Sequence, residues 1–216
     1  MSIVKKLFSL FFAITMVIGC SSVRMYSYHS VPPVKNNQHQ RVYPVYIDKS
    51  FPEDQQKVIA SVINEWNNVL NGNMVIEVVS KDIDSQDEIQ LMELVIQMRQ
   101  EREGLVMLNL THNDDLISGV VEETDGTLAF VNALGNRANF MVVISDRIGR
   151  KNLHKILLHE FGHAFGANHT NAQSLMYPYY SGVQMDCVDK ITVAQVANYH
   201  GFNFNTMNYC ATPHFE

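Results

Sequence analysis

The sequence predicts an α+β domain with a mixed, twisted sheet of about five strands, one helix that carries a functional motif, and two further main helices. Two patterns support this prediction. Short runs rich in β-branched and aromatic residues recur along the chain, and longer stretches repeat apolar residues at helical spacing. The 216 residues are 46% apolar, which suits one domain with its own core rather than two independent domains.

The first nineteen residues are expected to be a signal peptide rather than part of the fold. The sequence MSIVKKLFSLFFAITMVIGC combines a basic start with an apolar run that is too short to span a membrane. Its end, VIGC, resembles a bacterial lipobox, which implies cleavage before a lipidated Cys20. The alternative is an ordinary secretory signal with a coincidental cysteine. We expect a signal peptide over 1–19, the lipidated cysteine and a flexible tether over 20–40, and the folded domain over 41–216.

The domain is expected to begin with a strand, an amphipathic helix and a second strand. The run VYPVYID at 42–48 is typical of a strand, and Pro44 indicates an edge strand or the first strand. Ser50 and Glu53 have the spacing of a capping box, and apolar residues then follow at helical intervals up to Gly72, which suits the end of a helix. MVIEVV at 74–79 predicts the second strand.

The middle of the chain contains an ambiguous segment followed by clearer strands. In DEIQLMELVIQMRQERE, the apolar residues alternate as in a strand, yet Ile89, Met92, Ile96 and Arg99 also fit one face of a helix. We favour a strand over 91–98. The remaining patterns predict strands at 105–110, 126–133 and 139–146, the last two forming a pair, and a helix between 151 and 165.

Charge and cysteine content limit the partners. The chain has 16 Lys and Arg against 22 Asp and Glu, a net charge of −6, and no extended basic run, so nucleic acid is not expected to bind. Cys187 and Cys210 of an exported chain predict a disulfide that fixes the C-terminal tail, with two free thiols as the alternative. We expect the protein to be a monomer.

The predicted helix between 151 and 165 carries residues suited to metal binding. His159 and His163 are one helical turn apart on the same face, so their ring nitrogens can reach a single ion. Gly166 can adopt the left-handed conformation that ends a helix and reverses the chain. His169 can then supply a third ligand, which predicts a three-histidine zinc site.

Glu160, adjacent to the first ligand, is placed to act as a general base beside the metal. With each residue at roughly 5% frequency, the complete pattern arises by chance in fewer than about one chain in ten thousand. The alternatives are core histidines with satisfied hydrogen bonds and a closed structural zinc site, which would need a fourth protein ligand and no base.

The stretch HEFGHAFGANH at 159–169 resembles the long zinc signature of metzincin metallopeptidases. SLMYP at 174–178 resembles their Met-turn, which would place Met176 beneath the metal. Within the metzincins the similarity is greatest to matrixins, because PYY at 178–180 resembles the Pro-x-Tyr segment of their substrate pocket. DKITVAQVANYHG at 189–201 resembles their last helix, so the likeness extends over roughly residues 41–201.

This resemblance implies a metzincin-like fold, one catalytic zinc ion, and peptide-bond hydrolysis by a zinc-bound water that Glu160 activates. The substrate would lie extended along an edge strand at 126–133. Structural roles are implied for Gly166 and Met176. The implied substrate-binding residues are Leu128, Ala129, Leu158, Tyr177, Pro178 and Tyr180.

The sequence departs from the matrixin pattern at the second, structural zinc site. His112 and Asp114 resemble part of that site, but Phe130 and Asn139 occupy the positions where its other histidines align. We therefore expect one zinc ion. A calcium site is an open alternative, built from the loop residues Asp114, Asp115 and Asp125.

The sequence thus predicts a zinc endopeptidase that acts on extracytoplasmic peptides or proteins. The lipid on Cys20 would anchor it to a membrane of the cell envelope, facing the periplasm or the cell surface. The alternative is a non-catalytic surface lipoprotein or adhesin that keeps zinc and the metallopeptidase fold for stability.

Overall fold

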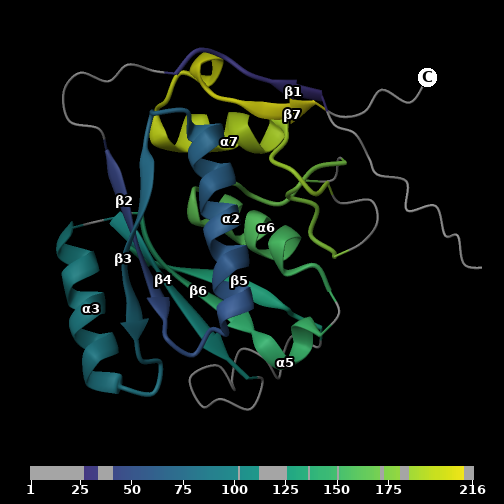
Figure 1. Cartoon of the computed structure of the whole chain (residues 1–216). Coiled ribbons are helices and arrows are strands. Elements are labelled where there is room, and N and C mark those ends of the chain that lie inside the picture. The colour runs from purple at the N-terminus through teal and green to yellow at the C-terminus, as the bar shows by residue number, and fades with distance from the viewer. Residues whose placement is uncertain are drawn as a thin grey trace, which may run out of the picture.

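A computed structural model describes residues 27–33, 41–101, 103–111, 126–135, 137–149, 151–170, 173–180 and 185–211 (Figure 1). The expected signal peptide and Cys20 lie outside these ranges, and so do the three aspartates of the calcium hypothesis. Within the described ranges, no helix has both the length and the apolar character needed to cross a lipid bilayer.

A five-stranded mixed sheet forms the centre of the domain and confirms the α+β prediction. The strand order is β3-β2-β4-β6-β5, and the first four strands are parallel. The last strand, β5, is antiparallel to β6 and forms one edge, as the resemblance to metzincins implied for this segment. The bounds are Val42–Asp48 (β2), Val75–Ile83 (β3), Glu103–Leu110 (β4), Ala129–Gly135 (β5) and Arg137–Ile144 (β6).

Pro44 lies in an interior strand rather than at an edge. Strand β2 is the first strand of this sheet along the chain, but it pairs with β3 on one side and β4 on the other. Its pairing with β4 begins only at Val45, opposite Leu105. The missing N–H of proline therefore precedes the ladder with β4, which explains how proline is accommodated here.

Helices cover both faces of the sheet, so the apolar core has two parts (Figure 1). Leu105 and Met107 of β4 face the cluster formed with α2 and α6, whereas Val106 and Leu108 face the cluster formed with α3. This alternation follows from the period of a strand whose two faces are both buried. The helices are α2 (Glu53–Leu70), α3 (Glu88–Glu101), α5 (Ser145–Ile148), α6 (Leu153–Ala164), α7 (Lys190–His200) and the 3-10 turn η1 (Phe204–Thr206).

The strand favoured over 91–98 was wrong, because this segment belongs to helix α3. Leu91, Leu94 and Met98, spaced at helical intervals, form its buried face against the sheet. Met92 and Ile96 are 60% and 51% exposed, and these solvent-facing apolar residues created the misleading alternation. The domain therefore has three main helices besides α6, one more than predicted.

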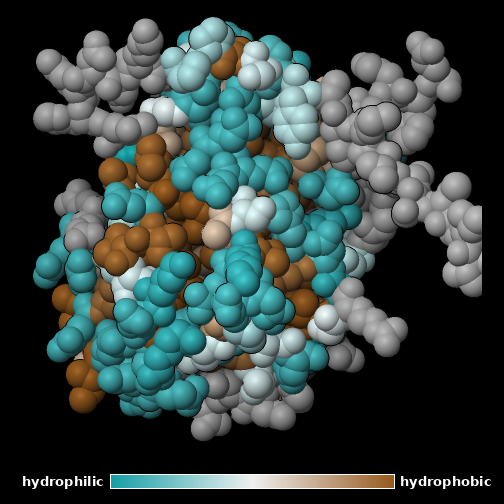
Figure 2. Space-filling view, viewed as in Figure 1, coloured by the Kyte–Doolittle hydropathy of each residue, from teal (hydrophilic) through white to brown (hydrophobic). Residues whose placement is uncertain are grey.

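Helix α2 forms as predicted, but its N-terminal cap differs. Pro52 occupies the cap position without a side-chain hydrogen bond, and Ser50 instead donates its backbone N–H to the Asp48 carboxylate. The capping-box prediction was therefore wrong. At the other end Asn71 takes a left-handed conformation with φ 48°, directly before the expected stop. The exposed side of α2 is mostly hydrophilic (Figure 2).

The two ends of the described chain pair with each other. Strand β1 (Ser27–His29) lies antiparallel to β7 (Tyr209–Ala211), beside α7 (Figure 1). This finding corrects the boundary at residue 41, because part of the expected tether packs against the domain. The Val31 N–H donates to the Asn208 side chain, which extends the contact. Cys187 and Cys210 are joined in a disulfide that ties β7 to the segment before α7.

Candidate functional site: a three-histidine metal centre

Helix α6 presents two histidines toward one point. The Asn152 side chain caps the helix by accepting the Lys155 N–H, and buried apolar residues such as Leu157 and Phe161 fix the helix on the core. His159 and His163 follow one turn apart, and their Nε2 atoms are 3.1 Å from each other. The sequence therefore places both ring nitrogens as the i, i+4 spacing predicts.

Helix α6 ends close to Gly166, as predicted from the sequence. Gly166 has φ +86°, and a side chain at this position would overlap the ring of Tyr199. The chain then reverses, and the Nε2 atom of His169 comes within 3.1 Å of the Nε2 atom of His163. Within the described ranges, these three histidines are the group of metal-ligating side chains close enough to share one ion.

Backbone carbonyls orient two of the three rings. The Nδ1–H of His159 donates to the Leu175 carbonyl at 2.8 Å, and that of His163 donates to the Ala167 carbonyl at 2.9 Å. Because a carbonyl only accepts hydrogen bonds, the proton of each neutral ring sits on Nδ1 and the lone pair on Nε2. Burial lowers the pKa of His159 to about 4 and also lowers that of His163, which keeps both rings neutral at pH 7.

A zinc ion fits this arrangement. Lone pairs that face each other at 3.1 Å repel unless a cation lies between them. Four tetrahedral ligands at about 2.0–2.1 Å from zinc lie roughly 3.3 Å from one another, close to the distances between these Nε2 atoms. Three neutral imidazoles would leave the fourth position open, as in catalytic rather than structural zinc sites.

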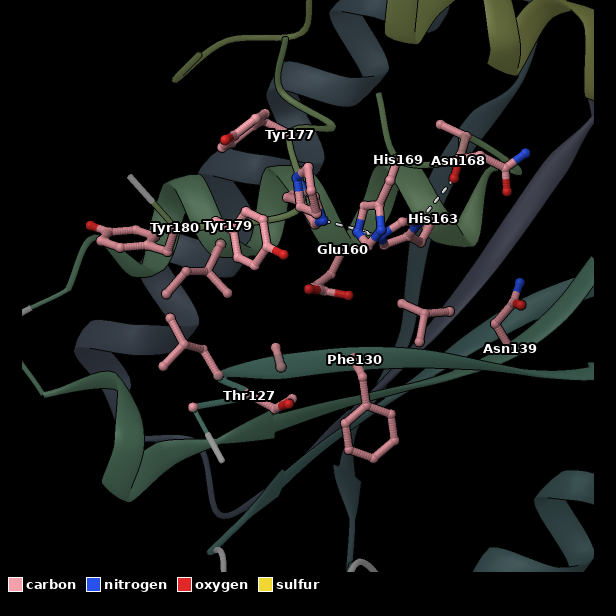
Figure 3. A pocket seen from close by; sticks show the side chains of 18 of the residues that line it. Thr127, Phe130, Asn139, Glu160, His163, Asn168, His169, Tyr177, Tyr179 and Tyr180 are labelled. Atoms are coloured by element: carbon pink, nitrogen blue, oxygen red, sulfur yellow. Dashed lines mark hydrogen bonds between the residues drawn. The ribbon is translucent and has the colours of Figure 1, made fainter. Parts of the chain in front are cut away.

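Glu160 lies beside the histidines with an unsatisfied carboxylate oxygen. The side chain is buried, and its Oε2 atom has no hydrogen-bond partner. Figure 3 shows the carboxylate pointing into the cleft below the histidine rings. Burial raises the pKa of Glu160 to about 8, and a nearby cation would lower that pKa by stabilising the charged form. A buried, unpaired carboxylate next to three metal-ligating nitrogens suits a base at a metal site.

The expected Met-turn lies beneath the helix. Met176 is fully buried, and its sulfur lies against Gly162, where an added Cβ would be only 2.5 Å away. Glycine at position 162 therefore lets the turn approach the helix closely. The contact fixes the segment whose Leu175 carbonyl orients His159.

Asp189 holds the Met-turn in place, a role that its local sequence does not reveal. Its buried Oδ2 atom accepts hydrogen bonds from the Ser174 hydroxyl and from the Leu175 N–H, at 2.8 and 2.7 Å. Its Oδ1 atom caps α7 by accepting the Ile191 and Thr192 N–H groups. The capping signal was readable at the start of the last helix, but the contact with the turn depends on the tertiary fold.

A cleft of about 570 Å³ runs between β5 and the metal centre. In Figure 3 the three tyrosines of 177–180 lie at one end, with Asn139 and Asn168 at the other. Five of the six proposed substrate-binding residues line the cleft: Leu128, Ala129, Tyr177, Pro178 and Tyr180.

Leu158 does not line the cleft, which corrects the sixth assignment. Its side chain is fully buried in the core, because it lies on the opposite side of α6 from the cleft. The neighbouring Ile156 lines the cleft instead, and Tyr179 was also missed. Adjacent helix positions point about 100° apart, and the motif alone did not determine which of them faces the substrate.

Comparison with known proteins identifies the family. A family model described as Matrixin matches residues 50–197, well over half of the chain. The chain belongs to the matrixin family. Matrixins are zinc metallopeptidases, and the histidine triad of this matrixin is suited to hold the zinc.

Two further similarities cover parts of longer proteins. Over 46 residues this matrixin is 50% identical to a protein of Trichoplusia ni ascovirus 2c described as "Putative matrix metalloproteinase", which covers 21% of this chain and 9% of that protein. The structure resembles metalloproteinase-II from Bacteroides fragilis with a TM-score of 0.47 and 17% identity, over 79% of this chain and 56% of that one. The chain thus spans less than two thirds of either relative.

Phe130 and Asn139 of this matrixin, which stand at histidine positions of the structural zinc site of matrixins, do not form a metal site. Asn139 is buried and donates from Nδ2 to the Tyr43 hydroxyl and to the Ala164 carbonyl, both at 3.1 Å. This amide therefore joins β6 to α6 rather than binding a metal. Phe130 packs against the cluster beneath α3. His112 and the aspartates of the calcium hypothesis lie outside the described residues, and nothing supports calcium.

We predict that Gly162→Ala destabilises the zinc-loaded protein although alanine favours helices by about 1 kcal/mol over glycine. The added methyl group would collide with the Met176 sulfur, and overpacking costs about 1–3 kcal/mol. Urea unfolding should therefore give a lower midpoint. In a Met176→Ala background the same substitution should be neutral or stabilising. An equal effect in both backgrounds would show that this contact does not determine the choice of glycine.

Proposed function

We propose that this matrixin is a zinc endopeptidase that hydrolyses extended segments of proteins or peptides outside the cytoplasm. The observation that carries the proposal is the Glu160 carboxylate, which is buried with one oxygen unpaired and points into the cleft beside three converging Nε2 atoms. A purely structural metal site has no use for such a base.

Hydrolysis would need both the metal ion and side chains of this protein. His159, His163 and His169 would hold the zinc ion, which would supply Lewis-acid polarisation of the scissile carbonyl and lower the pKa of a water molecule. Glu160 takes a proton from the attacking water on its carboxylate and then delivers it to the leaving amine nitrogen. The Leu175 and Ala167 carbonyls keep the His159 and His163 rings aligned, with the proton on Nδ1 and the lone pair on Nε2, while this happens.

Strand β5 supports an extended substrate. Among the described residues it pairs with β6 alone, so its other edge faces the cleft with backbone groups available for strand addition. Leu128, Ala129 and Val131 contribute to the cleft wall along this edge. A peptide added here would run antiparallel to β5 and pass directly below the metal centre.

The tyrosine-rich wall supports a preference for an apolar side chain after the cleaved bond. Tyr177 and Pro178 line this part of the cleft together with Ile156 from α6. The Tyr180 hydroxyl accepts the Asn152 N–H at 2.7 Å, and the Lys155 ammonium lies 5.8 Å from the ring centre of Tyr180. These contacts fix Tyr180 against the start of α6, so this wall is held in place by the helix that carries the metal ligands.

Export and anchoring are part of the proposal. The sequence VIGC before residue 21 supports lipidation of Cys20, and the disulfide between Cys187 and Cys210 is suited to an oxidising compartment. The enzyme would then act at the cell envelope on substrates that reach its membrane.

We predict that Glu160→Gln lowers kcat by about a hundredfold to ten-thousandfold, the range for loss of a general base, while zinc content stays near one per chain. Cleavage of denatured protein and of quenched peptides would measure the loss. The matched control is Glu65→Gln. Burial raises the pKa of Glu65 to about 7, but Glu65 lies on α2 and does not line the cleft.

The control variant should retain wild-type cleavage. Equal cleavage by the wild type and the Glu160→Gln protein would contradict the assigned base. If the zinc-loaded wild type cleaves no member of a peptide library under any condition, the result would support a non-catalytic surface lipoprotein or adhesin instead of an enzyme.

We predict that Cys20→Ser moves the full-length protein from the membrane fraction to the soluble fraction of expressing cells. Mass spectrometry of the mature N-terminal peptide should find an acylated cysteine only in the wild type. Membrane association that persists unchanged in Cys20→Ser, or an unmodified Cys20 in the wild type, would favour an ordinary secretory signal.

A further inference from the structure

Arg137 lies on the strand next to the substrate edge, near the point where the edge strand β5 ends. It is the first residue of β6, immediately after the hairpin that follows β5. Ala133 and Asn139 line the cleft at this end and are register partners in the β5–β6 ladder. Arg137 precedes Asn139 by two residues, and side chains two apart on a strand share a face. Its side chain therefore lies on the face of the sheet that carries the cleft.

An aromatic ring connects the guanidinium to a residue that lines the cleft. The Arg137 guanidinium carbon lies 5.6 Å from the centre of the Tyr199 ring, and Nη2 donates to the Tyr199 carbonyl at 3.5 Å. The same ring packs over Gly166, where a Cβ would collide with it, and Gly166 lines the cleft. Tyr199 thus contacts both Arg137 and Gly166, at the start of the segment that leads to the third zinc ligand, His169.

This cation has no carboxylate partner within the described part of the chain, where no acidic side chain lies at ion-pair distance from Arg137. Its register partner on β4, Glu103, binds the guanidinium of Arg41 instead. A half-buried guanidinium with free donors binds carboxylates well, because its planar fork matches their two oxygens. The chain as a whole has a net charge of −6 and does not attract acidic groups. Arg137 is therefore a local positive charge to which an acidic group can bind.

The direction of the substrate decides which of its residues reaches Arg137. The wall at Tyr177 and Pro178 receives the side chain after the cleaved bond in the proposed function, so the opposite end of the cleft holds the residues before it. Arg137 lies at that opposite end, beyond Ala133 and Asn139. The only backbone carboxylate of a protein is at its C-terminus, and the residues before a cleaved bond do not include it. The acidic group that reaches Arg137 must therefore be a side chain.

We propose that Arg137, supported by Tyr199, forms a carboxylate-binding subsite that selects substrates with aspartate or glutamate upstream of the cleaved bond. This inference rests on the proposed endopeptidase function and specifies its substrate class. Arg137 acts as a specificity-determining residue and takes no part in the bond-breaking step.

The test compares peptides that carry glutamate or glutamine, one position at a time, at the second to fifth residues before the cleaved bond. At one of these positions, wild-type kcat/KM should favour glutamate by about fivefold or more, and the preference should shrink in high salt. Arg137→Gln should abolish the preference. Lys57→Gln is the matched control: it removes the same charge from an exposed position on α2 and should leave the preference intact.

Two further measurements test the subsite if no peptide is cleaved or if Arg137→Gln does not fold. The affinities of the same peptides for the zinc-loaded Glu160→Gln protein test the subsite even if no peptide is cleaved, which separates failure of the subsite from failure of the enzymatic proposal. Arg137→Lys keeps the charge and should keep part of the preference if Arg137→Gln does not fold. Equal binding and cleavage of both peptide series by the wild type, or a preference retained in folded Arg137→Gln, would overturn the proposal.

Discussion

Three imidazole nitrogens converge on one point, and the segments around the cleft are arranged to keep them there. His159, His163 and His169 bring their Nε2 atoms to about hydrogen-bond distance, and two rings carry their protons on the opposite nitrogen. Facing lone pairs are stable only around a cation. The local sequence supplies the ligands, but their orientation comes from carbonyl groups that the tertiary fold places.

Two supports from α7 maintain those carbonyls and the returning chain. Asp189, at the start of the helix, fixes the Met-turn and so the carbonyl that orients His159. Tyr199, near its end, packs over Gly166, where the chain reverses toward His169. The disulfide between Cys187 and Cys210 and the pairing of β1 with β7 tie the surrounding segments together. The last helix of the domain thus determines the geometry of the metal centre.

Sequence patterns predicted local features better than tertiary ones. The ligand spacing and the glycine stop were readable, because each depends on a few adjacent residues, whereas the edge position of β5 was implied by the resemblance to metzincins. Helix α3 was misassigned because Met92 and Ile96 are apolar yet exposed. Leu158 was misplaced because only packing decides which side of α6 meets the core. The role of Asp189 was not visible, since it joins residues that are distant in sequence and lie in different elements.

X-ray absorption at the zinc edge of the purified, zinc-loaded protein measures the number and type of the zinc ligands. We predict one zinc ion per chain with three histidine nitrogens at about 2.0–2.1 Å and one non-protein oxygen, and loss of one nitrogen ligand in His169→Ala. A fourth protein ligand, a sulfur ligand, or an unchanged spectrum in His169→Ala would contradict an open, three-histidine catalytic site.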